Sequence, residues 1–191
     1  MSKVELRKEM IAARNGLSPQ QHNLLSNTIA DTFLESSIYA KATYIYAYAF
    51  INNEVDTTLI INKALSDGKT VALPCSYMSN GVPKMDFYEI SSISDLAPGY
   101  KGILEPDRRK AGVKKPLIEP DVVLVPGVCF DYALNRIGYG KGFYDRYLTK
   151  HESALRVGLS FNFQVIEQIP ADVNDVKMDI IITENGAFFY E

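Results

Sequence analysis

Val122-Val123-Leu124-Val125-Pro126-Gly127 is the stretch that decides the fold class of this chain. Its first four residues are all apolar and three are β-branched, which is typical of a strand buried on both faces in the middle of a parallel sheet. Pro126-Gly127 then ends the run, because proline removes a backbone donor and glycine favours a turn. Such a strand needs helices on both faces of its sheet, which predicts an α/β protein.

The rest of the chain alternates between expected strands and expected helices. Strands are also expected over residues 43–50, 70–74, 85–90, 155–160 and 179–183, and helices over 2–14, 19–34, from 58 to about 66, and 143–150. This order predicts a three-layer α/β sandwich, with a mostly parallel central sheet flanked by helices in a Rossmann-like topology. Residues 97–120 are rich in proline, glycine and charge and are expected to form a long surface connection.

The composition shows no division into halves, so one domain over residues 1–191 is expected. The net charge of −3 argues against a nucleic-acid partner. No apolar run is long enough to span a membrane, and the first residues lack a hydrophobic signal core, so we expect a cytoplasmic protein without membrane contact. A monomer is expected, and the two cysteines, Cys75 and Cys129, need no redox role.

Histidine is scarce, with only His22 and His151 in the chain. Neither lies beside a nucleophile or a second metal ligand in the sequence, and both are expected at the surface. The chain therefore offers few residues for a zinc site or for a Ser-His or Cys-His nucleophile. Any chemistry is expected to use carboxylates, cations, backbone dipoles or a borrowed cofactor.

Residues 136–147, Arg-Ile-Gly-Tyr-Gly-Lys-Gly-Phe-Tyr-Asp-Arg-Tyr, carry the strongest functional signal. Glycines at 138, 140 and 142 allow backbone N–H groups to turn toward an anion, Lys141 adds a charge, and the helix expected from Phe143 would point its positive end at the same place. The spacing fits neither a P-loop nor a dinucleotide fingerprint. On spacing alone the loop is either an anion-binding turn, with phosphate as its guest, or a tight structural turn without a ligand.

The first expected helix carries cations on its apolar face. On a helical wheel, Lys3, Arg7 and Arg14 share a stripe with Met10. Charges there would be costly to bury alone, so one interpretation is a stripe that overlooks a cleft holding an anion. The other is that Lys3 and Arg7 reach back to water from the first helical turns.

Carboxylates complete the set of candidate site residues. Glu54 follows the aromatic strand 43–50, at the end of the sheet where ligands bind, although most isolated loop glutamates are solvated. Asp145, beside the glycine loop, and Asp179, at the start of a short strand, are candidate Mg²⁺ ligands alongside nucleotide phosphates. The alternative for Asp145 is a pair with Lys141 or a cap on the helix dipole.

Residues Val125–Asp131, followed by Asn135–Asp145, resemble the signature of the 5-formyltetrahydrofolate cyclo-ligase family, whose members are also called methenyltetrahydrofolate synthetases. Four further elements match in the family's order, namely Lys3-x-x-Leu6-Arg7, Asn53-Glu54-x-x-Thr57, Gly102-Ile-x-Glu105-Pro106 and Met178-Asp179. The resemblance extends over almost the whole chain. Cys75 departs from it, since many members carry a basic residue there.

The resemblance implies an ATP- and Mg²⁺-dependent ligase of one-carbon metabolism. Such an enzyme closes 5-formyltetrahydrofolate, with or without a polyglutamate tail, to 5,10-methenyltetrahydrofolate and releases ADP and phosphate. The formyl oxygen would be phosphorylated first and the neighbouring folate amine would then attack, so no protein nucleophile is needed. The implied fold is similar to the sugar-phosphate isomerase and CoA-transferase-like folds.

The resemblance also implies roles for individual residues. The nucleotide-binding residues would be Lys3, Val4, Glu5, Leu6, Arg7, Arg136, Ile137, Gly138, Tyr139, Gly140, Lys141, Gly142, Phe143 and Tyr144. The substrate-binding residues would be Ala49, Glu54, Tyr139, Gly140, Lys141, Gly142 and Phe143. Lys141 and Arg136 would act on the transferring phosphoryl group, and Asp145 and Asp179 would hold Mg²⁺.

Two other kinds of function stay open at this point. A non-catalytic RNA- or protein-binding relative would keep the fold without the chemistry, and a sugar-phosphate isomerase or acyl-CoA transferase would use a similar sandwich. The acidic net charge and the intact set Lys3, Arg7, Glu54, Lys141 and Asp145 speak against the first. No nucleophilic glutamate is identified for a transferase.

Overall fold

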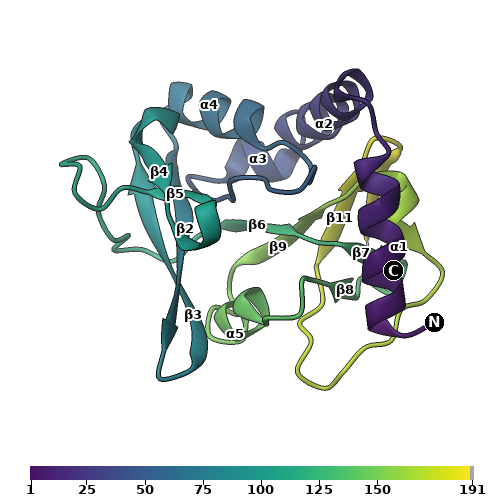
Figure 1. Cartoon of the computed structure of the whole chain (residues 1–191). Helices are drawn as coiled ribbons and strands as arrows, with labels where there is room; N and C mark the ends of the chain where they lie inside the picture. Colours follow the sequence, from purple (N-terminus) through teal and green to yellow (C-terminus); the bar gives the residue numbers. More distant parts are fainter. Residues whose placement is uncertain (190–191) are drawn as a thin grey trace.

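A computed structural model describes residues 1–189, so the last two residues of the range expected to form one domain lie outside it. Its centre is a seven-stranded sheet with the order β12-β11-β9-β6-β1-β2-β3 (Figure 1). Strands β1, β2, β6, β9 and β11 are parallel, and the edge strands β3 and β12 run antiparallel to their neighbours. The strands are β1 Tyr44–Tyr46, β2 Thr70–Ser79, β3 Val82–Ile90, β6 Val122–Pro126, β9 Leu155–Leu159, β11 Ile180–Thr183 and β12 Gly186–Phe189.

Strand β6 is the buried central strand that its sequence predicts. It pairs with β1 on one side and β9 on the other, and the side chains of Val122 to Val125 are at most 2% exposed. Leu124 packs into the apolar cluster on one face of the sheet, and Val123 and Val125 into the cluster on the other. An unbroken apolar run is therefore required here, because both faces are covered.

Helices cover both faces of the sheet, which confirms the predicted three-layer α/β architecture. One face carries α2 Pro19–Leu34, α3 Ser37–Lys41 and α4 Thr58–Ser66, whose side chains Ile29, Phe33 and Ile60 are 0% exposed (Figure 1). The other face carries α5 Phe143–Leu148. The predicted bounds of α2 agree with the structure, and Ser18 and Gln21 form the capping box at its start.

Helix α1, Lys3–Asn15, packs away from the main sheet. Leu6 and Met10 lie against a small sheet with the order β10-β7-β8, formed by Val165–Ile166, Cys129–Asp131 and Arg136–Ile137 (Figure 1). Sequence patterns did not predict this sheet, since its strands are only two or three residues long. It matters for function because β8 leads directly into the glycine loop.

The connection of the strands fixes where a ligand can bind. From β1 the chain moves outward to β2, and it later returns to β6 on the opposite side of β1. Loops leaving the carboxyl ends of β1 and β6 must therefore separate, and a crevice forms between them. Glu54 lies in the loop after β1, and the glycine loop lies beyond the end of β6.

Several local predictions need correction. Strands β2 and β3 form a long hairpin that extends past the expected ends at 74 and 85. The sequence did not predict this extension, because the outer half of the hairpin is exposed and lacks apolar alternation. The segment 97–120 is not wholly irregular, since β4 Leu96–Pro98 pairs with β5 Leu104–Pro106. Both histidines, expected at the surface, are partly exposed. In residues 1–189 we find no helix with the length and apolar character needed to cross a membrane.

The role of β6 predicts the effect of a core mutation. Leu124 is 0% exposed, so Leu124→Ala is expected to lower the free energy of unfolding by about 2–5 kcal/mol, through lost burial and the cavity that remains. Urea unfolding measures this loss. Leu117→Ala is the matched control, because Leu117 is 94% exposed and its loss is expected to stay within about 0.5 kcal/mol. Equal effects of the two substitutions would contradict the central position of β6.

Candidate functional site

A cavity of about 850 Å³ lies at the carboxyl ends of β1 and β6. Residues from α1, the loop after β1, the β2–β3 hairpin, the β4–β5 segment and the glycine loop line its wall. The sequence-predicted residues found in that wall are Lys3, Arg7, Ala49, Glu54, Arg136, Ile137, Gly138, Tyr139, Gly140, Lys141, Gly142, Phe143, Tyr144 and Asp145. Segments far apart in the chain thus meet in one concave site, as ligand sites generally require.

The glycine loop takes backbone conformations that favour glycine. Gly140 and Gly142 have φ values of +84° and +65°, and a side chain at either position would be strained. A Cβ on Gly140 would lie 3.4 Å from the Arg7 guanidinium, and one on Gly138 would lie 2.7 Å from Nη1 of Arg136. The glycines therefore serve two purposes here, because they allow the turn and they let arginines approach the loop.

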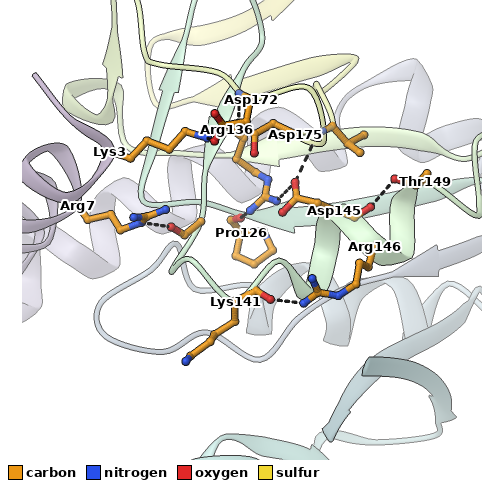
Figure 2. Close-up of polar contacts among 12 residues, drawn as sticks. Lys3, Arg7, Pro126, Arg136, Lys141, Asp145, Arg146, Thr149, Asp172 and Asp175 are labelled. Carbon is orange, nitrogen blue, oxygen red and sulfur yellow. Dashed lines mark hydrogen bonds and ion pairs between the residues drawn. The ribbon is translucent and has the colours of Figure 1, made fainter. Parts of the chain in front are cut away.

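Backbone donors of this loop are left available. Within residues 1–189, the N–H groups of Tyr139, Gly140 and Lys141 donate to no other backbone group. Arg7 contributes from outside the loop, since its Nε donates to the carbonyl of Gly138 at 2.7 Å (Figure 2). Helix α5 has only six residues, so its dipole adds less than the longer predicted helix over 143–150 would.

Arg136 is the most constrained cation in the cavity wall. Its Nη2 donates to Oδ1 of Asp145 at 2.8 Å, and its Nη1 donates to the carbonyl of Pro126 at 3.3 Å (Figure 2). The residue is 5% exposed. Asp145 therefore pairs with Arg136 and not with Lys141, the partner that the sequence alternative named.

Lys3 reaches the cavity from the first turn of α1 and meets two carboxylates. Its Nζ lies 2.5 Å from Oδ2 of Asp172 and 2.5 Å from Oδ2 of Asp175. Burial favours the neutral amine, but these hydrogen bonds outweigh it and raise the pKa of Lys3, which stays charged. Lys3 and Arg7 line a cavity, as the first interpretation of the helix stripe expects, whereas Arg14 is buried outside its wall and the anion stays a prediction.

Arg146 fixes the backbone of the catalytic candidate Lys141. Its Nη2 donates to the Lys141 carbonyl (Figure 2). Its Nε donates to the carbonyl of Pro83 on β3 at 3.0 Å. Figure 2 shows the Lys141 side chain extending away from Arg146 and from the Arg136–Asp145 pair. Lys141 takes part in none of the ion pairs formed by residues 1–189, so its ammonium can meet a ligand.

Glu54 lines the cavity and is buried, with 4% exposure. Its Oε2 accepts a hydrogen bond from the Ile51 N–H at 3.0 Å, and its backbone carbonyl lies 2.7 Å from Nε2 of His22. Burial raises the pKa of Glu54 to about 7, although the Ile51 N–H, Arg14 and the Tyr139 hydroxyl act in the other direction. Glu54 lines the cavity and is not a solvated surface glutamate, while its contact with a ligand stays a prediction.

The segment 97–120 contributes one wall of the cavity. Tyr100 packs edge-on against Phe143, with ring centroids 5.8 Å apart. Glu105 is 8% exposed and holds this wall to β2, because it accepts hydrogen bonds from the N–H of Ser76 at 2.8 Å and of Tyr100 at 3.2 Å. These two rings give the wall an aromatic surface, which suits a flat heterocyclic ligand.

Four predicted site residues lie outside the cavity wall. Val4 is 71% exposed, Leu6 packs in the core against β7 and β8, and the Glu5 carboxylate accepts the Ser2 N–H as part of the helix cap. Asp179 lies at the amino end of β11, whereas the cavity forms at the carboxyl ends of the parallel strands. Its carboxylate pairs with the Arg156 guanidinium, at 2.8 Å to Nε and 2.6 Å to Nη2.

The predicted Mg²⁺ pair is therefore not assembled. Asp179 and Asp145 are each engaged by an arginine, and only Asp145 lines the cavity. Among the residues that the structure describes, no group of three Asp, Glu, His or Cys side chains could hold a metal ion. The side chains alone do not form a metal cage, which leaves phosphate oxygens and water to supply most ligands of any bound Mg²⁺.

Sequence reasoning missed several residues of the wall. Asp172 and Asp175 lie in a loop whose pattern gives no signal, and only the fold brings them to Lys3. Ser76 belongs to the unexpected extension of the β2–β3 hairpin, whereas Met85 begins a predicted strand that was not linked to the site. Asn52 lies close to Glu54 in the same loop. The signal used for Glu54, a polar residue soon after a strand, could therefore have identified Asn52 as well.

This arrangement defines a class of protein before any comparison. An α/β sheet with a cation-rich glycine loop and a buried carboxylate in the wall of one cavity is typical of an enzyme active site.

Comparison with known proteins gives the family. The family model described as 5-formyltetrahydrofolate cyclo-ligase family matches residues 1–184. A probable 5-formyltetrahydrofolate cyclo-ligase of Caenorhabditis elegans is 28% identical, covering 99% of this chain and 96% of that protein. The 5-formyltetrahydrofolate cyclo-ligase of Saccharomyces cerevisiae is 32% identical, covering 97% and 96%. The NMR structure of a 5,10-methenyltetrahydrofolate synthetase from Aquifex aeolicus superposes with a TM-score of 0.83 at 32% identity, covering 99% of this chain and 93% of that one.

The chain belongs to the 5-formyltetrahydrofolate cyclo-ligase family. It is thus a ligase-type enzyme acting on a small-molecule folate, and the resemblance read from the sequence is confirmed. The alternative of a non-catalytic RNA- or protein-binding relative loses its support, because the named relatives at 27–32% identity are cyclo-ligases over most of the chain.

The burial of Glu54 predicts a pH-dependent stability. Because the pKa is raised from 4.5 to about 7, the folded state favours the neutral acid. The stabilising contribution is full below pH 4.5 and is lost as the pH rises through 7. Glu54→Gln removes this dependence, so its stability relative to the wild type is expected to rise by about 2–3 kcal/mol between pH 5 and pH 8.

Urea unfolding at the two pH values measures this difference. Glu35→Gln, an exposed glutamate at the end of α2, is the control and is expected to change stability by less than about 0.5 kcal/mol at both. A stability difference for Glu54→Gln that does not vary with pH would show that Glu54 ionises as freely in the folded protein as in the unfolded one.

Proposed function

We propose that this protein catalyses the ATP-dependent cyclisation of 5-formyltetrahydrofolate to 5,10-methenyltetrahydrofolate, with release of ADP and phosphate. The observation that carries the proposal is the cavity in which a cation-lined glycine loop faces the buried Glu54, in a chain of this family. One end of that cavity suits polyphosphate and the other suits a polar ring with N–H donors.

The nucleotide phosphates are assigned to the glycine-loop end. Arg7 and Arg136 lie against the loop, Lys3 and Lys141 lie in the same wall, and the loop amides are unpaired by other backbone groups. Several cations and backbone donors held in fixed positions favour a triphosphate, because little reorganisation is needed when it binds. Lys3 would exchange part of its contact with Asp172 and Asp175 for phosphate oxygens.

The folate ring is assigned to the Glu54 end. A carboxylate can accept two hydrogen bonds from adjacent N–H donors of a pterin, and the low exposure of Glu54 strengthens such bonds. Tyr139 and Phe143 from the loop, with Tyr100 packed against Phe143, would provide apolar surface for the ring. Substrate and nucleotide then meet at residues 139–143.

The chemistry follows from this juxtaposition. The formyl oxygen attacks the γ-phosphorus, the bond between that phosphorus and the bridging oxygen breaks, and ADP leaves. The neighbouring folate amine then attacks the activated carbon, the carbon–oxygen bond to phosphate breaks, and the amine loses its proton. Lys141 and Arg136 would neutralise charge on the moving phosphoryl oxygens, so alignment and electrostatics suffice without a protein nucleophile.

Mg²⁺ is proposed to bind with the nucleotide. Asp145 is the predicted ligand that lines the cavity, and it would share the ion with phosphate oxygens and water. The ion would supply charge neutralisation on the phosphates when bound. Asp179 does not fit this role, because it lies outside the cavity wall and is held by Arg156. A cytoplasmic location and a monomeric state remain predictions from the sequence.

Removing the Lys141 ammonium tests the proposed chemistry. Lys141→Ala is expected to lower kcat by about 100-fold or more, because a preorganised cation facing the transferring group is lost. The absorbance rise on formation of methenyltetrahydrofolate, followed with and without ATP and Mg²⁺, measures the rate. Lys150→Ala is the control, since Lys150 is exposed and lies outside the cavity wall. Wild-type rates in Lys141→Ala would remove Lys141 from the mechanism, and a wild type without ATP-dependent product would refute the activity.

The two aspartates are expected to respond differently to Mg²⁺. Asp145→Asn is expected to raise the half-saturating Mg²⁺ concentration several-fold, whereas Asp179→Asn is expected to leave it unchanged. Asp179→Asn should instead lower the free energy of unfolding by about 1–3 kcal/mol, since the Arg156 guanidinium loses a charged partner. Mg²⁺ titrations of the rate and urea unfolding measure the two effects. A raised Mg²⁺ requirement in Asp179→Asn at unchanged stability would return that residue to the metal site.

A further inference from the structure

Arg146 connects the glycine loop to the outer part of the β2–β3 hairpin. Its Nη2 donates to the carbonyl of Lys141 in the loop, and its Nε donates to the carbonyl of Pro83 at 3.0 Å. One side chain can reach both acceptors because α5 packs beside β3 (Figure 1). Arg146 is exposed and does not line the cavity, so it acts on the site only through the backbone of the loop.

These contacts do not serve helix α5 itself. An arginine that stabilises its own helix pairs with an acid three or four residues away or bonds the carbonyls of the last turn. Both acceptors of Arg146 lie outside α5, since Lys141 precedes the helix and Pro83 belongs to β3. None of the ion pairs within residues 1–189 includes Arg146. Its guanidinium is thus committed to the two backbone carbonyls.

The bond to Lys141 fixes the orientation of one peptide unit. The Lys141 carbonyl and the Gly142 N–H belong to the same planar trans peptide, in which the two groups point in opposite directions. The carbonyl points to Arg146, which lies outside the cavity wall (Figure 2). Gly142 lines that wall, so its N–H is turned to the cavity side. In the part of the chain that the structure describes, this N–H donates to no other backbone group.

Gly142 makes the contact with Arg146 possible. Its φ of +65° is a left-handed conformation that favours glycine. A Cβ at this position would lie 2.9 Å from Nη1 of Arg146 and would push the guanidinium away. The glycine therefore lets the arginine lie against one side of the loop, while the N–H on the other side stays open to a ligand.

We propose that Arg146 is a positioning residue for the bound polyphosphate: by holding the Lys141 carbonyl outside the cavity, it presents the Gly142 N–H to a phosphate oxygen. The inference rests on the proposed function for the identity of this ligand. The fixed peptide itself is a property of the ligand-free protein. A donor that is oriented beforehand stabilises a developing negative charge more than one that must first turn, and the exposed end of the β2–β3 hairpin gains a role as the support of that donor.

The fixed peptide is tested first with inorganic triphosphate and no folate, by NMR titration of the backbone amides. In the wild type, the Gly142 amide proton is expected to move downfield when triphosphate binds. Arg146→Met keeps most of the side-chain length but removes its donors. It is expected to bind triphosphate about fivefold more weakly and to lose most of the Gly142 shift, the effect of about one hydrogen bond.

The control is Arg109→Met, because Arg109 is an exposed arginine outside the cavity wall that pairs with Asp107. It is expected to retain wild-type binding and the wild-type Gly142 shift. An unmoved Gly142 amide in the wild type would overturn the proposal, and so would a full Gly142 shift in Arg146→Met.

A conservative substitution separates the hydrogen bond from a general effect on folding. Arg146→Lys keeps a charged donor that can reach the Lys141 carbonyl, and it is expected to bind triphosphate within about twofold of the wild type. Circular dichroism shows whether each variant folds. If Arg146→Met fails to fold, Arg146→Ala takes its place, since alanine favours an exposed helical position. Equal losses in Arg146→Lys and Arg146→Met would mean that hydrogen bonding to the loop is not the cause.

Turnover then links the peptide to the reaction. Arg146→Met is expected to lower kcat about tenfold and to leave KM for 5-formyltetrahydrofolate within about twofold, because the Gly142 N–H acts on phosphate and not on folate. A raised KM for folate at wild-type kcat would overturn the proposed role. A wild type that shows the Gly142 shift with triphosphate but makes no ATP-dependent product would instead refute the proposed function and leave the positioning of polyphosphate standing.

Discussion

The Arg136 guanidinium connects the sheet to the site, and most of the cavity depends on it. One of its nitrogens donates to the carbonyl of Pro126, where the central strand ends, and another donates to Asp145 on α5. Gly138 leaves room for the same group, because a Cβ there would lie 2.7 Å from Nη1. A single buried cation thus fixes the strand end, the glycine loop and the helix that follows it. The arrangement is rigid because a guanidinium offers donors in a fixed plane.

The cations of the cavity are held in different ways, and this division gives the site its character. Arg136 and Lys3 are paired with carboxylates, which makes their burial tolerable and fixes their positions. Arg7 is held by the Gly138 carbonyl, and Lys141 is exposed at the cavity wall. Positive charge is therefore both preorganised and available to a ligand. Glu54 is shielded from water, and a hydrogen bond to its carboxylate is therefore stronger than it would be in solvent.

Much of the fold could be predicted because its signals are local. The apolar run in β6, the capping box of α2 and the alternation of strand and helix each depend on neighbouring residues, and each agrees with the structure. The small sheet of β7, β8 and β10 could not be predicted, because two or three residues give no periodicity. The extension of the β2–β3 hairpin was not predicted for a different reason, because strands that pair in solvent need no apolar pattern in their sequence. For the site, the glycine loop and Lys3 and Arg7 of the α1 stripe pointed to residues that line the cavity, whereas Asp179, at the start of its strand, lies at the end of the sheet away from the cavity.

The sequence by itself determined the α/β class, the family and the residue types available for chemistry, because patterning, motif spacing and the scarcity of histidine are properties of the linear chain. Only the tertiary structure decided which charges meet. It brings Lys3 to Asp172 and Asp175, pairs Asp145 with Arg136, turns Asp179 toward Arg156, and joins Arg14 to the Tyr139 hydroxyl. These contacts join residues far apart in the chain, and their strength depends on distance and burial, which no local pattern encodes.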